Sequence, residues 1–384
     1  MNLKVLYVAP LVSPRDNPWF SPGRFKKIQQ VNDLLSRAGY TLELINTAPF
    51  TFDSPNCKVF NLCTARQSLF RYYQLVFNAV KFCLHYKSDS HSLLIWVYNT
   101  RLPELIFLII SSLFLSNLRF VIQVEDVAAA RSQVSALSRA VDAISAFVFI
   151  RYKPIHVFAV SEVVAQKFSQ IYKFPLHNIS CLPPLLCDNY LNLCKLRTNP
   201  FSSNTVNVVY AGGYEAEKGV DDLIAAFLLA IGKGFNATLT LIGSAPTHLL
   251  EKYSNNSLII FKGILSEYDL TLQLLSADVL VNPHRPILNS SHIFPYKTIE
   301  MLASGSLPLT TRMPGIDSFG LPPDCFFSGI SELSSKLLNS RLIWTNKSAE
   351  ILNLAENTRK YYSMARFIAM VRPAVIFGGT NPPN

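Results

Sequence analysis

The sequence lacks an apolar run long enough to cross a membrane. Its most hydrophobic stretch, residues 105–118, is shorter than the roughly 20 residues that a spanning helix needs, and the charged residues Arg101, Glu104 and Arg119 lie beside it. We expect a helix that packs in or beside an α/β core, with an interfacial membrane helix as the alternative. No exporting signal precedes the first apolar run at residues 5–10, so we expect a cytoplasmic protein.

Paired cysteines and metal-binding motifs are also lacking. The seven cysteines include no Cys-x2-Cys pair, and their odd number argues against a disulfide framework, so we expect buried thiols in a reducing compartment. The seven histidines show no metal-ligand spacing, and no Asp-x-Asp loop is present. We therefore expect neither a metal nor a cofactor. The 384 residues are 49% hydrophobic, which excludes a disordered chain and fits two domains.

Positive charge is concentrated in one half of the chain. Residues 1–195 hold 20 Lys and Arg against 11 Asp and Glu, a balance of +9, whereas residues 196–384 hold 15 against 14, a balance of +1. A basic surface favours nucleic acid, an anionic membrane face or a phosphorylated substrate, although it can also be merely solvated. We find no helix-turn-helix, RNA-binding aromatic motif or Arg/Lys run, so nucleic acid is not an expected partner.

Strands and helices alternate along both halves. In the first half, strands are predicted at 3–9, 41–45, 93–98, 119–124 and 156–160, with helices at 25–38, 103–117 and 161–172. Residues 187–205 read as irregular, and the alternation restarts with strands at 206–211, 237–243, 258–262, 279–282 and 307–310. This pattern predicts an α/β chain of two facing Rossmann-like domains with parallel sheets. The predicted domains are 1–195 and 196–355, with 356–384 as a helix or tail that returns to the first domain.

The first local motif in the second half spans residues 208–227. Gly212 and Gly213 follow a strand and let the backbone approach a ligand without a Cβ atom. Lys218 then lies at the mouth of a strand-to-helix loop, where it suits a diphosphate. A tight turn with a solvated lysine is the alternative.

A second motif spans residues 291–305, where a loop enters a helix with Pro295 near its first turn. The helix N-terminus then points at whatever lies before Pro295. Glu300 comes about one and a half turns into this helix, where its carboxylate can accept hydrogen bonds from ribose hydroxyls. An ordinary surface glutamate is the alternative.

In the first half, candidate residues follow predicted strands. Glu125 and Asp126 end the run 120–126, where they are candidate catalytic carboxylates or, alternatively, a helix N-cap. Tyr98 and Asn99 end the preceding strand and are expected to line the same site. Gly23 and Arg24, which follow a proline-rich loop, are the final pair of candidates, as part of an acceptor or phosphate loop.

The two motifs of the second half, 208–227 and 291–305, resemble the donor-binding domain of retaining GT-B glycosyltransferases, specifically glycosyltransferase family 4. The shared blocks are Lys-Gly-Val-Asp at 218–221, a glycine after the next strand at 243, Phe-x-Gly-x-Leu at 261–265, Ala-Asp-Val-x-Val-x-Pro at 277–283, and Phe-Pro-x-Lys-x-x-Glu-x-x-Ala-x-Gly at 294–305. The resemblance covers about residues 206–312. It implies donor binding by Gly212, Gly213, Lys218, Gly243, Pro295, Tyr296, Lys297 and Glu300.

Two positions depart from the family pattern. Many members carry an arginine after the first glycine, whereas Gly213 and Tyr214 stand here, so Arg24 and Arg285 are candidate substitutes. The family's Glu-x7-Glu pair becomes His292 with Glu300. This substitution makes His292 a third candidate for the catalytic group beside Asp126 and Glu125.

The resemblance implies a metal-independent hexosyltransferase that moves a sugar, with retention, from a nucleotide-diphosphate sugar to a glycan or lipid-linked acceptor. Lys218, Lys297 and the helix N-terminus would stabilise the leaving diphosphate. We expect a role in bacterial surface polysaccharide or lipopolysaccharide synthesis, at the inner face of a membrane. The alternatives are a nucleotide-sugar 2-epimerase of the same fold, a non-catalytic relative and a basic scaffold protein.

Overall fold

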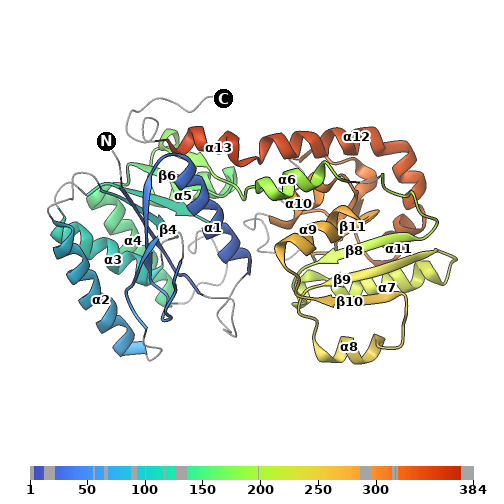
Figure 1. The fold of residues 1–384 in the computed structure, drawn as a ribbon, viewed down its shortest axis with the longest axis horizontal. Coiled ribbons are helices and arrows are strands. Elements are labelled where there is room, and N and C mark those ends of the chain that lie inside the picture. Colours follow the sequence, from blue (N-terminus) through green and yellow to red (C-terminus); the bar gives the residue numbers. More distant parts are fainter. Residues whose placement is uncertain are drawn as a thin grey trace. The chain divides into compact units, whose positions relative to one another are not determined.

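The chain folds into two compact units, each with its own parallel sheet (Figure 1). The computed structural model describes residues 4–12, 22–54, 57–64, 68–87, 93–99, 101–115, 118–125, 136–197, 199–285, 296–313, 316 and 319–372. Unit 1 comprises Met1–Leu185 with Met364–Asn384, and unit 2 comprises Leu186–Ser363. The predicted α/β class with two Rossmann-like domains is confirmed.

Unit 1 is built on a seven-stranded sheet in the order β3-β2-β1-β4-β5-β6-β7, with every described strand pair parallel. The strands are β1 (Lys4–Ala9), β2 (Thr41–Asn46), β3 (Lys58–Asn61), β4 (Leu93–Tyr98), β5 (Phe120–Val124), β6 (His156–Ala159) and β7 (Ile179–Cys181). Strand β4 reads Leu-Leu-Ile-Trp-Val-Tyr and is buried along its whole length. Such continuous apolar runs are typical of parallel strands covered by helices on both faces.

The helices of unit 1 are α1 (Pro22–Arg37), α2 (Ser68–His85), α3 (Leu102–Phe114), α4 (Ala136–Tyr152), α5 (Glu162–Tyr172) and α13 (Met364–Val371). Helices α1 and α13 pack on one face, where Ile28, Phe367 and Trp96 share a core. Helices α2 to α5 follow one another along the other face. Tyr40 donates its hydroxyl to the carbonyl of Val371 at 2.6 Å, which fastens the returning C-terminal helix to this unit.

Unit 2 is built on a six-stranded parallel sheet in the order β10-β9-β8-β11-β12-β13. Its strands are β8 (Val206–Ala211), β9 (Ala237–Ile242), β10 (Ile259–Gly263), β11 (Val279–Asn282), β12 (Leu307–Thr311) and β13 (Phe326–Phe327). Its helices are α6 (Asp188–Cys194), α7 (Val220–Ile231), α8 (Thr247–Tyr253), α9 (Glu267–Leu275), α10 (Tyr296–Ser304), α11 (Ile330–Leu338) and α12 (Ser340–Tyr361). Helices α7 and α11 lie together, and α6 and α10 both neighbour α9.

The expectation of an irregular segment at 187–205 was wrong for residues 188–194, which form α6. Tyr190 and Cys194 of this helix are buried in a cluster with Leu274 and Ile299. Because that burial fixes α6 to unit 2, the division falls at 185/186, whereas the predicted one fell at 195/196. The return to unit 1 likewise begins at Met364, since α12 packs on the core of unit 2 through Ile351 and Ala355.

The apolar segment at 105–118 forms most of α3, whose residues Leu105, Phe107 and Leu108 are buried. Within the part of the chain that the structure describes, no helix combines the length and apolar character needed to cross a membrane. In the same residues no disulfide joins any of the seven cysteines, and four of them are buried.

Candidate functional site

The order of the strands in unit 2 locates its candidate site. Successive strands run outward in one direction from β8 to β10 and in the other direction from β11 to β13. Ligands of open α/β sheets bind at this reversal point, beyond the carboxyl ends of the two central strands. Here β8 ends at Ala211 and β11 at Asn282, so the loops that follow both strands, beginning with Gly212 and Pro283, form the site.

Two glycines allow close approaches at the carboxyl ends of β8 and β9. The amide of Gly212 donates to the carbonyl of Ile242 at 2.8 Å, and Gly243 has a φ of +135°. A Cβ atom on Gly243 would lie 2.0 Å from the carbonyl oxygen of Gly212. One on Gly212 would lie 2.0 Å from the Lys297 Nζ. The missing side chains therefore make room for backbone at one position and for an ammonium group at the other.

Lys297 extends from the first turn of α10 to this glycine. The residue is exposed overall, yet its ammonium nitrogen lies against Gly212 and 5.6 Å from the centroid of the Tyr210 ring. This partial burial of the charged end, reinforced by the nearby charge of Lys218, lowers the pKa of Lys297 to about 8. The side chain thus carries a cation whose charge is costly until an anion is bound.

Lys218 lies on the other side of the site, next to a histidine that follows β11. Its Nζ is 3.4 Å from the Nε2 of His284. The Nδ1 of His284 lies 2.9 Å from the carbonyl oxygen of Arg285, which can only accept, so Nδ1 carries the proton and Nε2 accepts from Lys218. Burial, together with the charge of Lys218, lowers the pKa of His284 below its usual value. A neutral imidazole therefore orients the ammonium group of Lys218.

Glu300 lies three residues after Lys297, so both side chains project from the same side of α10. It is half-buried, and its backbone carbonyl accepts a hydrogen bond of 2.5 Å from the hydroxyl of Tyr190 on α6. The charges of Glu215 and Glu300 both act to raise the pKa of Lys297, opposing Lys218. Two cations and two carboxylates thus surround the glycine-lined end of β8.

The structure describes only some of the other residues that were predicted for the site. Gly213 is close to Glu215, whose Oε2 would lie 2.1 Å from an added Cβ atom. His292 and Pro295 lie outside the described residues, as does the side chain of Tyr296. Their predicted roles stay predictions.

Arg285, a candidate substitute for the missing family arginine, is held by another residue. Its guanidinium forms a two-point ion pair with Asp222 at the start of α7, with distances of 2.7 and 2.8 Å, and also donates to the carbonyl of Ala216 at 3.1 Å. The pair is mutual, since Arg285 also lowers the pKa of Asp222. Arg285 therefore fixes the loop that carries Lys218, and Arg24 belongs to unit 1.

In unit 1, Glu125 belongs to a hydrogen-bonded network at the end of β5. Its Oε1 accepts from the side chain of Gln123 at 2.7 Å and lies 3.9 Å from the Nζ of Lys27. Its backbone amide donates to the side chain of Asn99 at 2.9 Å. Lys27 is buried and donates to the carbonyl of Leu182 at 2.9 Å, and burial lowers its pKa to about 8. The predicted partner carboxylate, Asp126, lies outside the described residues.

Tyr98 is central to a second group of polar residues at the carboxyl end of β4. Burial raises the pKa of its hydroxyl, with a further contribution from Glu125. Burial also lowers the pKa of Arg24, with a further contribution from the charge of Arg101. The structure therefore brings Arg24, Tyr98, Asn99 and Glu125 to one edge of the sheet of unit 1. Gly23 lies in the first turn of α1, next to Arg24.

Glu104 is a buried carboxyl that the sequence analysis did not select. It lies in the first turn of α3, and one oxygen accepts a hydrogen bond from the hydroxyl of Thr47. The other has no hydrogen-bond partner among the described residues. Burial raises the pKa of Glu104 to about 7, against opposing effects of Thr47, Arg101 and Arg71.

Sequence reasoning missed His284, Lys27 and Glu104 as members of these groups. A signal existed for His284, because it follows a predicted strand at the same sheet edge as Gly212. Glu104 could be recognised only as a single charge in the first turn of an apolar helix. The long-range contacts of Lys27 leave no pattern in the sequence around it.

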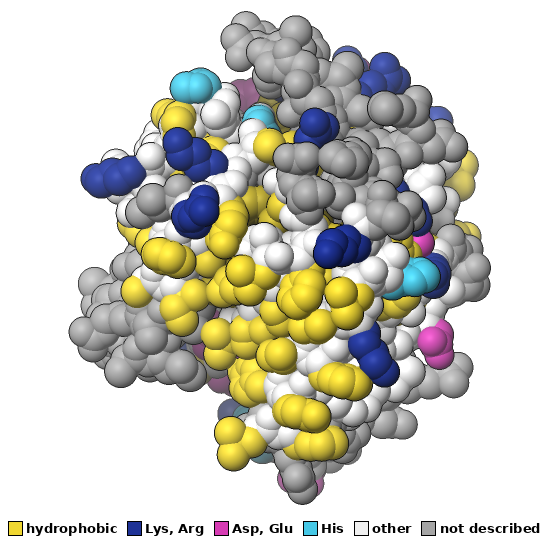
Figure 2. Space-filling view, turned by 90° about the vertical axis from the view of Figure 1, so that its left-hand side faces the viewer, with side chains coloured by type: hydrophobic (Ala, Val, Ile, Leu, Met, Phe, Trp, Pro, Cys, Tyr) yellow, Lys and Arg dark blue, Asp and Glu magenta, His cyan; other side chains and the backbone are white. Residues whose placement is uncertain are grey.

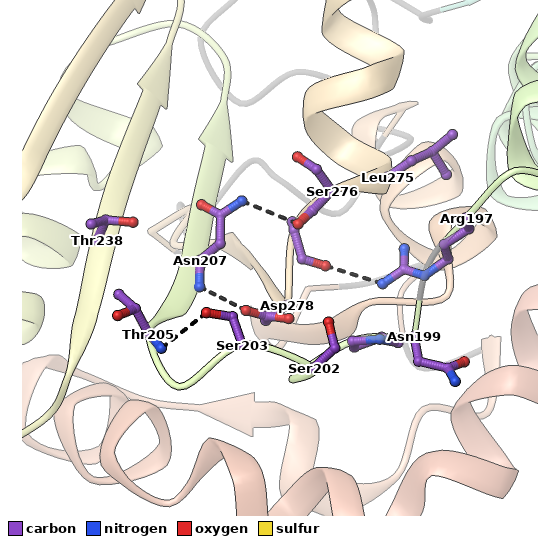
Figure 3. Close-up of a pocket in the computed structure, with 12 residues that line it drawn as sticks. Arg197, Asn199, Ser202, Ser203, Thr205, Asn207, Thr238, Leu275, Ser276 and Asp278 are labelled. Atoms are coloured by element: carbon purple, nitrogen blue, oxygen red, sulfur yellow. Dashed lines mark hydrogen bonds between the residues drawn. The ribbon is translucent and has the colours of Figure 1, made fainter.

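A polar cavity of about 260 Å³ opens at the opposite edge of the sheet of unit 2 (Figure 3). It lies at the amino ends of β8, β9 and β11, next to Asn207, Thr238 and Asp278. Asn207 donates to Asp278 at 2.8 Å and to the carbonyl of Ser276 at 3.1 Å, and Arg197 donates to the carbonyl of Ala277 at 3.0 Å. The Asn207 bonds tie β8 to the turn before β11, and the Arg197 bond ties the segment after α6 to the same turn, so we assign the cavity a structural role.

No group of three or more His, Cys, Asp and Glu side chains among the described residues could hold a metal ion. The candidate groups at the carboxyl edges of the two sheets, one in each unit, combine cations with hydrogen-bonding side chains. This combination is the chemistry of anion recognition.

Comparison with known proteins agrees with this geometry. Residues 205–320 match the family model of group 1 glycosyl transferases. No curated protein matches the chain. Among solved structures, a glycosyltransferase from Rickettsia africae superposes with a TM-score of 0.70 at 15% identity, covering 96% of each chain.

Two further solved structures share the fold. The lipopolysaccharide outer core galactosyltransferase WaaB superposes with a TM-score of 0.64 at 13% identity, covering 98% of this chain and 100% of its own. A protein from Listeria monocytogenes assigned as a UDP-N-acetylglucosamine 2-epimerase gives a TM-score of 0.60 at 10% identity, covering 100% and 99%. The chain therefore has the GT-B fold, and its residues 205–320 are similar to the group 1 glycosyl transferases.

Proposed function

We propose that the protein is a glycosyltransferase that uses a nucleotide-diphosphate sugar as donor. The observation that carries this proposal is the pair of cations, Lys218 and Lys297, at the glycine-lined reversal point of the sheet in unit 2. This point lies within the residues that match group 1 glycosyl transferases. A diphosphate placed beside Gly212 would neutralise both ammonium groups.

In the proposed reaction, the bond between the anomeric carbon of the sugar and the diphosphate breaks and a bond from an acceptor hydroxyl oxygen to that carbon forms. The hydroxyl proton passes to the departing diphosphate, on whose oxygen negative charge develops. Lys297 and Lys218 stabilise this charge, which is electrostatic assistance to the leaving group. His284 holds Lys218 in place through Nε2. Glu300 accepts hydrogen bonds from the ribose hydroxyls of the donor. We propose no metal requirement, because two lysines supply the positive charge. We also propose retention of the anomeric configuration, which rests on the resemblance to retaining GT-B enzymes.

On the acceptor side, we propose that the edge of unit 1 around Arg24, Tyr98 and Asn99 binds the acceptor. The cationic Arg24 fits an acceptor that bears phosphate, as a lipid-diphosphate carrier does. We further propose that Asp126, with Glu125 and His292 as the other candidates, meets the reacting sugars. A hexosyl donor and a lipid-linked glycan acceptor of bacterial surface polysaccharide synthesis fit this assignment, and WaaB is a fold neighbour that acts on lipopolysaccharide.

A nucleotide-sugar 2-epimerase is the second candidate, favoured by one observation: a protein assigned to that class shares the fold over the whole chain. An epimerase would use the same donor site but would need no acceptor. A non-catalytic relative would bind the donor and turn over nothing.

The test is a panel of nucleotide-diphosphate sugars ranked by thermal shift, followed by product analysis of the best donor with and without lipid-diphosphate acceptors. We expect a donor-dependent rise in melting temperature and release of the nucleoside diphosphate that accelerates with acceptor. Conversion of the donor to its 2-epimer without an acceptor would establish the second candidate. Absence of any shift across the panel would contradict the donor site.

A further inference from the structure

Helix α2 exposes a row of large apolar side chains on the outside of unit 1. Leu69 is 86% exposed, Tyr73 66% and Phe77 47%. The opposite side of the same helix is buried, through Leu75 and Phe82. The helix is therefore apolar on both sides, although only one of them packs against the protein.

The exposed aromatic rings of α2 form an ordered ladder. Phe70 and Tyr73 are stacked with their centroids 6.4 Å apart, and Tyr73 and Phe77 with theirs 6.3 Å apart. The ammonium group of Lys81 continues the row, 4.6 Å from the centroid of Phe77. Three rings and a cation thus follow one side of the helix over three turns.

The neighbouring helices extend this apolar surface. Leu113 of α3 is 69% exposed and Phe147 of α4 is 67% exposed, and α3 packs between α2 and α4. Figure 2 views unit 1 from the side that carries α2 and α3, and shows hydrophobic side chains gathered in a broad area with Lys and Arg mostly at its margin. A soluble monomer seldom leaves such an area open to water.

The exposed charged side chains of α2 and α3 are all basic. Helix α2 contains Arg71, Lys81 and His85 but no Asp or Glu, and the single acid of α3, Glu104, is buried. Lysine and arginine can lay their alkyl chains on apolar surface while the charged ends reach a polar layer. Aromatic rings and leucines with a cationic rim fit the boundary between lipid headgroups and acyl chains.

We propose that the exposed face of α2, continued by Leu113 of α3 and Phe147 of α4, is a membrane-docking surface that inserts into the headgroup layer of an anionic bilayer. A second copy of the chain is a poorer occupant, because a two-fold contact would bring Lys81 of both copies into one interface to which α2 contributes no acidic residue. An anionic lipid surface supplies the opposite charge. This inference deepens the proposed function by assigning the surface through which the enzyme reaches a lipid-linked acceptor.

The test is co-sedimentation of the full chain with vesicles of phosphatidylcholine alone or with about one third phosphatidylglycerol. We expect binding to the anionic vesicles only, with part of the binding persisting at high salt because apolar side chains insert. The double substitution Leu69→Gln/Phe77→Gln should weaken binding about tenfold or more. Lys81→Glu should weaken it roughly tenfold at low salt and much less at high salt.

Matched controls lie in unit 2. Leu196 is 75% exposed and Leu342 60% exposed, so Leu196→Gln/Leu342→Gln removes a similar apolar area elsewhere, and Lys233→Glu repeats the charge change on an exposed lysine. These controls should bind vesicles as the unmodified chain does. Failure of the unmodified chain to bind anionic vesicles, or equal loss in the controls, would overturn the proposal.

Sedimentation velocity tests the alternative occupant of this surface, a second copy of the chain. A dimer that Leu69→Gln/Phe77→Gln converts to a monomer, without vesicle binding, would assign the face to a second copy. Donor binding, measured by calorimetry without vesicles, should be the same in all these variants. Failure of the proposed function is therefore distinguishable from failure of the docking surface.

Discussion

Lys218 and Glu300 are the residues whose roles follow most directly from the site. Lys218→Ala should weaken binding of a nucleoside diphosphate by about 1.5–3 kcal/mol, since it removes a charge-assisted contact. Glu300→Gln should weaken binding less than Glu300→Ala, because the amide keeps an acceptor for the ribose. Titration calorimetry measures all three, with Lys233→Ala on the exposed turn after α7 as the control. Unchanged affinity in the Lys218 and Glu300 variants would refute the assignment.

The lowered pKa of Lys297 predicts that the affinity for a diphosphate depends on pH. Because its pKa in the ligand-free protein is lowered to about 8, the side chain loses its proton above that pH, well before an ordinary lysine would. A bound diphosphate favours the charged form, so affinity should fall by up to about tenfold per pH unit above pH 8. Calorimetry at alkaline pH in buffers of different ionisation enthalpy should show proton uptake on binding. Lys297→Arg, which stays charged, should abolish the dependence.

Glu104 predicts a pH dependence of stability in unit 1. Its pKa rises from the ordinary 4.5 to about 7 on folding, so between these values the folded state binds a proton that the unfolded state has released. Its contribution to the free energy of unfolding therefore falls as pH rises from about 4.5 to 7 and is constant outside this window, a loss of about 3 kcal/mol. Urea unfolding at several pH values should show that the unfolding free energy of the unmodified protein falls more steeply with pH in this window than that of Glu104→Gln. Parallel pH profiles of the unfolding free energy in the two proteins would contradict the raised pKa of Glu104.

Between elements, the loops after β8 and β9 show how closely the site is packed. Gly243→Ala would place a Cβ atom 2.0 Å from the Gly212 carbonyl, whereas Gly263→Ala, also at positive φ, would meet nothing within 4 Å. Gly263→Ala should cost about 1 kcal/mol, from backbone conformation alone. Gly243→Ala should cost more, by a further 1–3 kcal/mol. Equal losses of unfolding free energy in the two variants would show that the loops can separate freely.

The elements of unit 2 were more predictable from sequence than those of unit 1. Strands β8 and β11 follow from compact apolar runs bounded by Gly212 and Pro283, and both match the predicted ranges. No element was assigned to 68–85, where α2 carries apolar residues on both its buried and its exposed side. Helix α6 was missed because it is short, and its burial against α9 and α10 depends on residues far along the chain.

The candidate site was predictable to the extent that it follows strand ends. Gly212, Lys218 and Glu300 could be selected because sequence motifs fix their places on the sheet. The contact between Lys297 and Gly212, and that between Lys218 and His284, could not be predicted, since each joins segments far apart in the sequence. Local sequence likewise could not show that Arg285 pairs with Asp222.

At the scale of the whole molecule, the two units have separate cores, and all the predicted donor-site residues belong to unit 2. A nucleoside diphosphate should therefore stabilise unit 2 selectively. At a concentration about 100 times its dissociation constant, it should add about 2.7 kcal/mol to the unfolding free energy of the unit that binds it. Hydrogen exchange read by mass spectrometry should show slower exchange in peptides around Gly212, Lys218 and α10, and little change around β4 and β5. Lys218→Ala at the same ligand concentration should lose most of this protection. Equal protection of both units would mean that the ligand also contacts unit 1, which would contradict a donor site contained in unit 2, or that the two units unfold together, which would contradict selective stabilisation of unit 2.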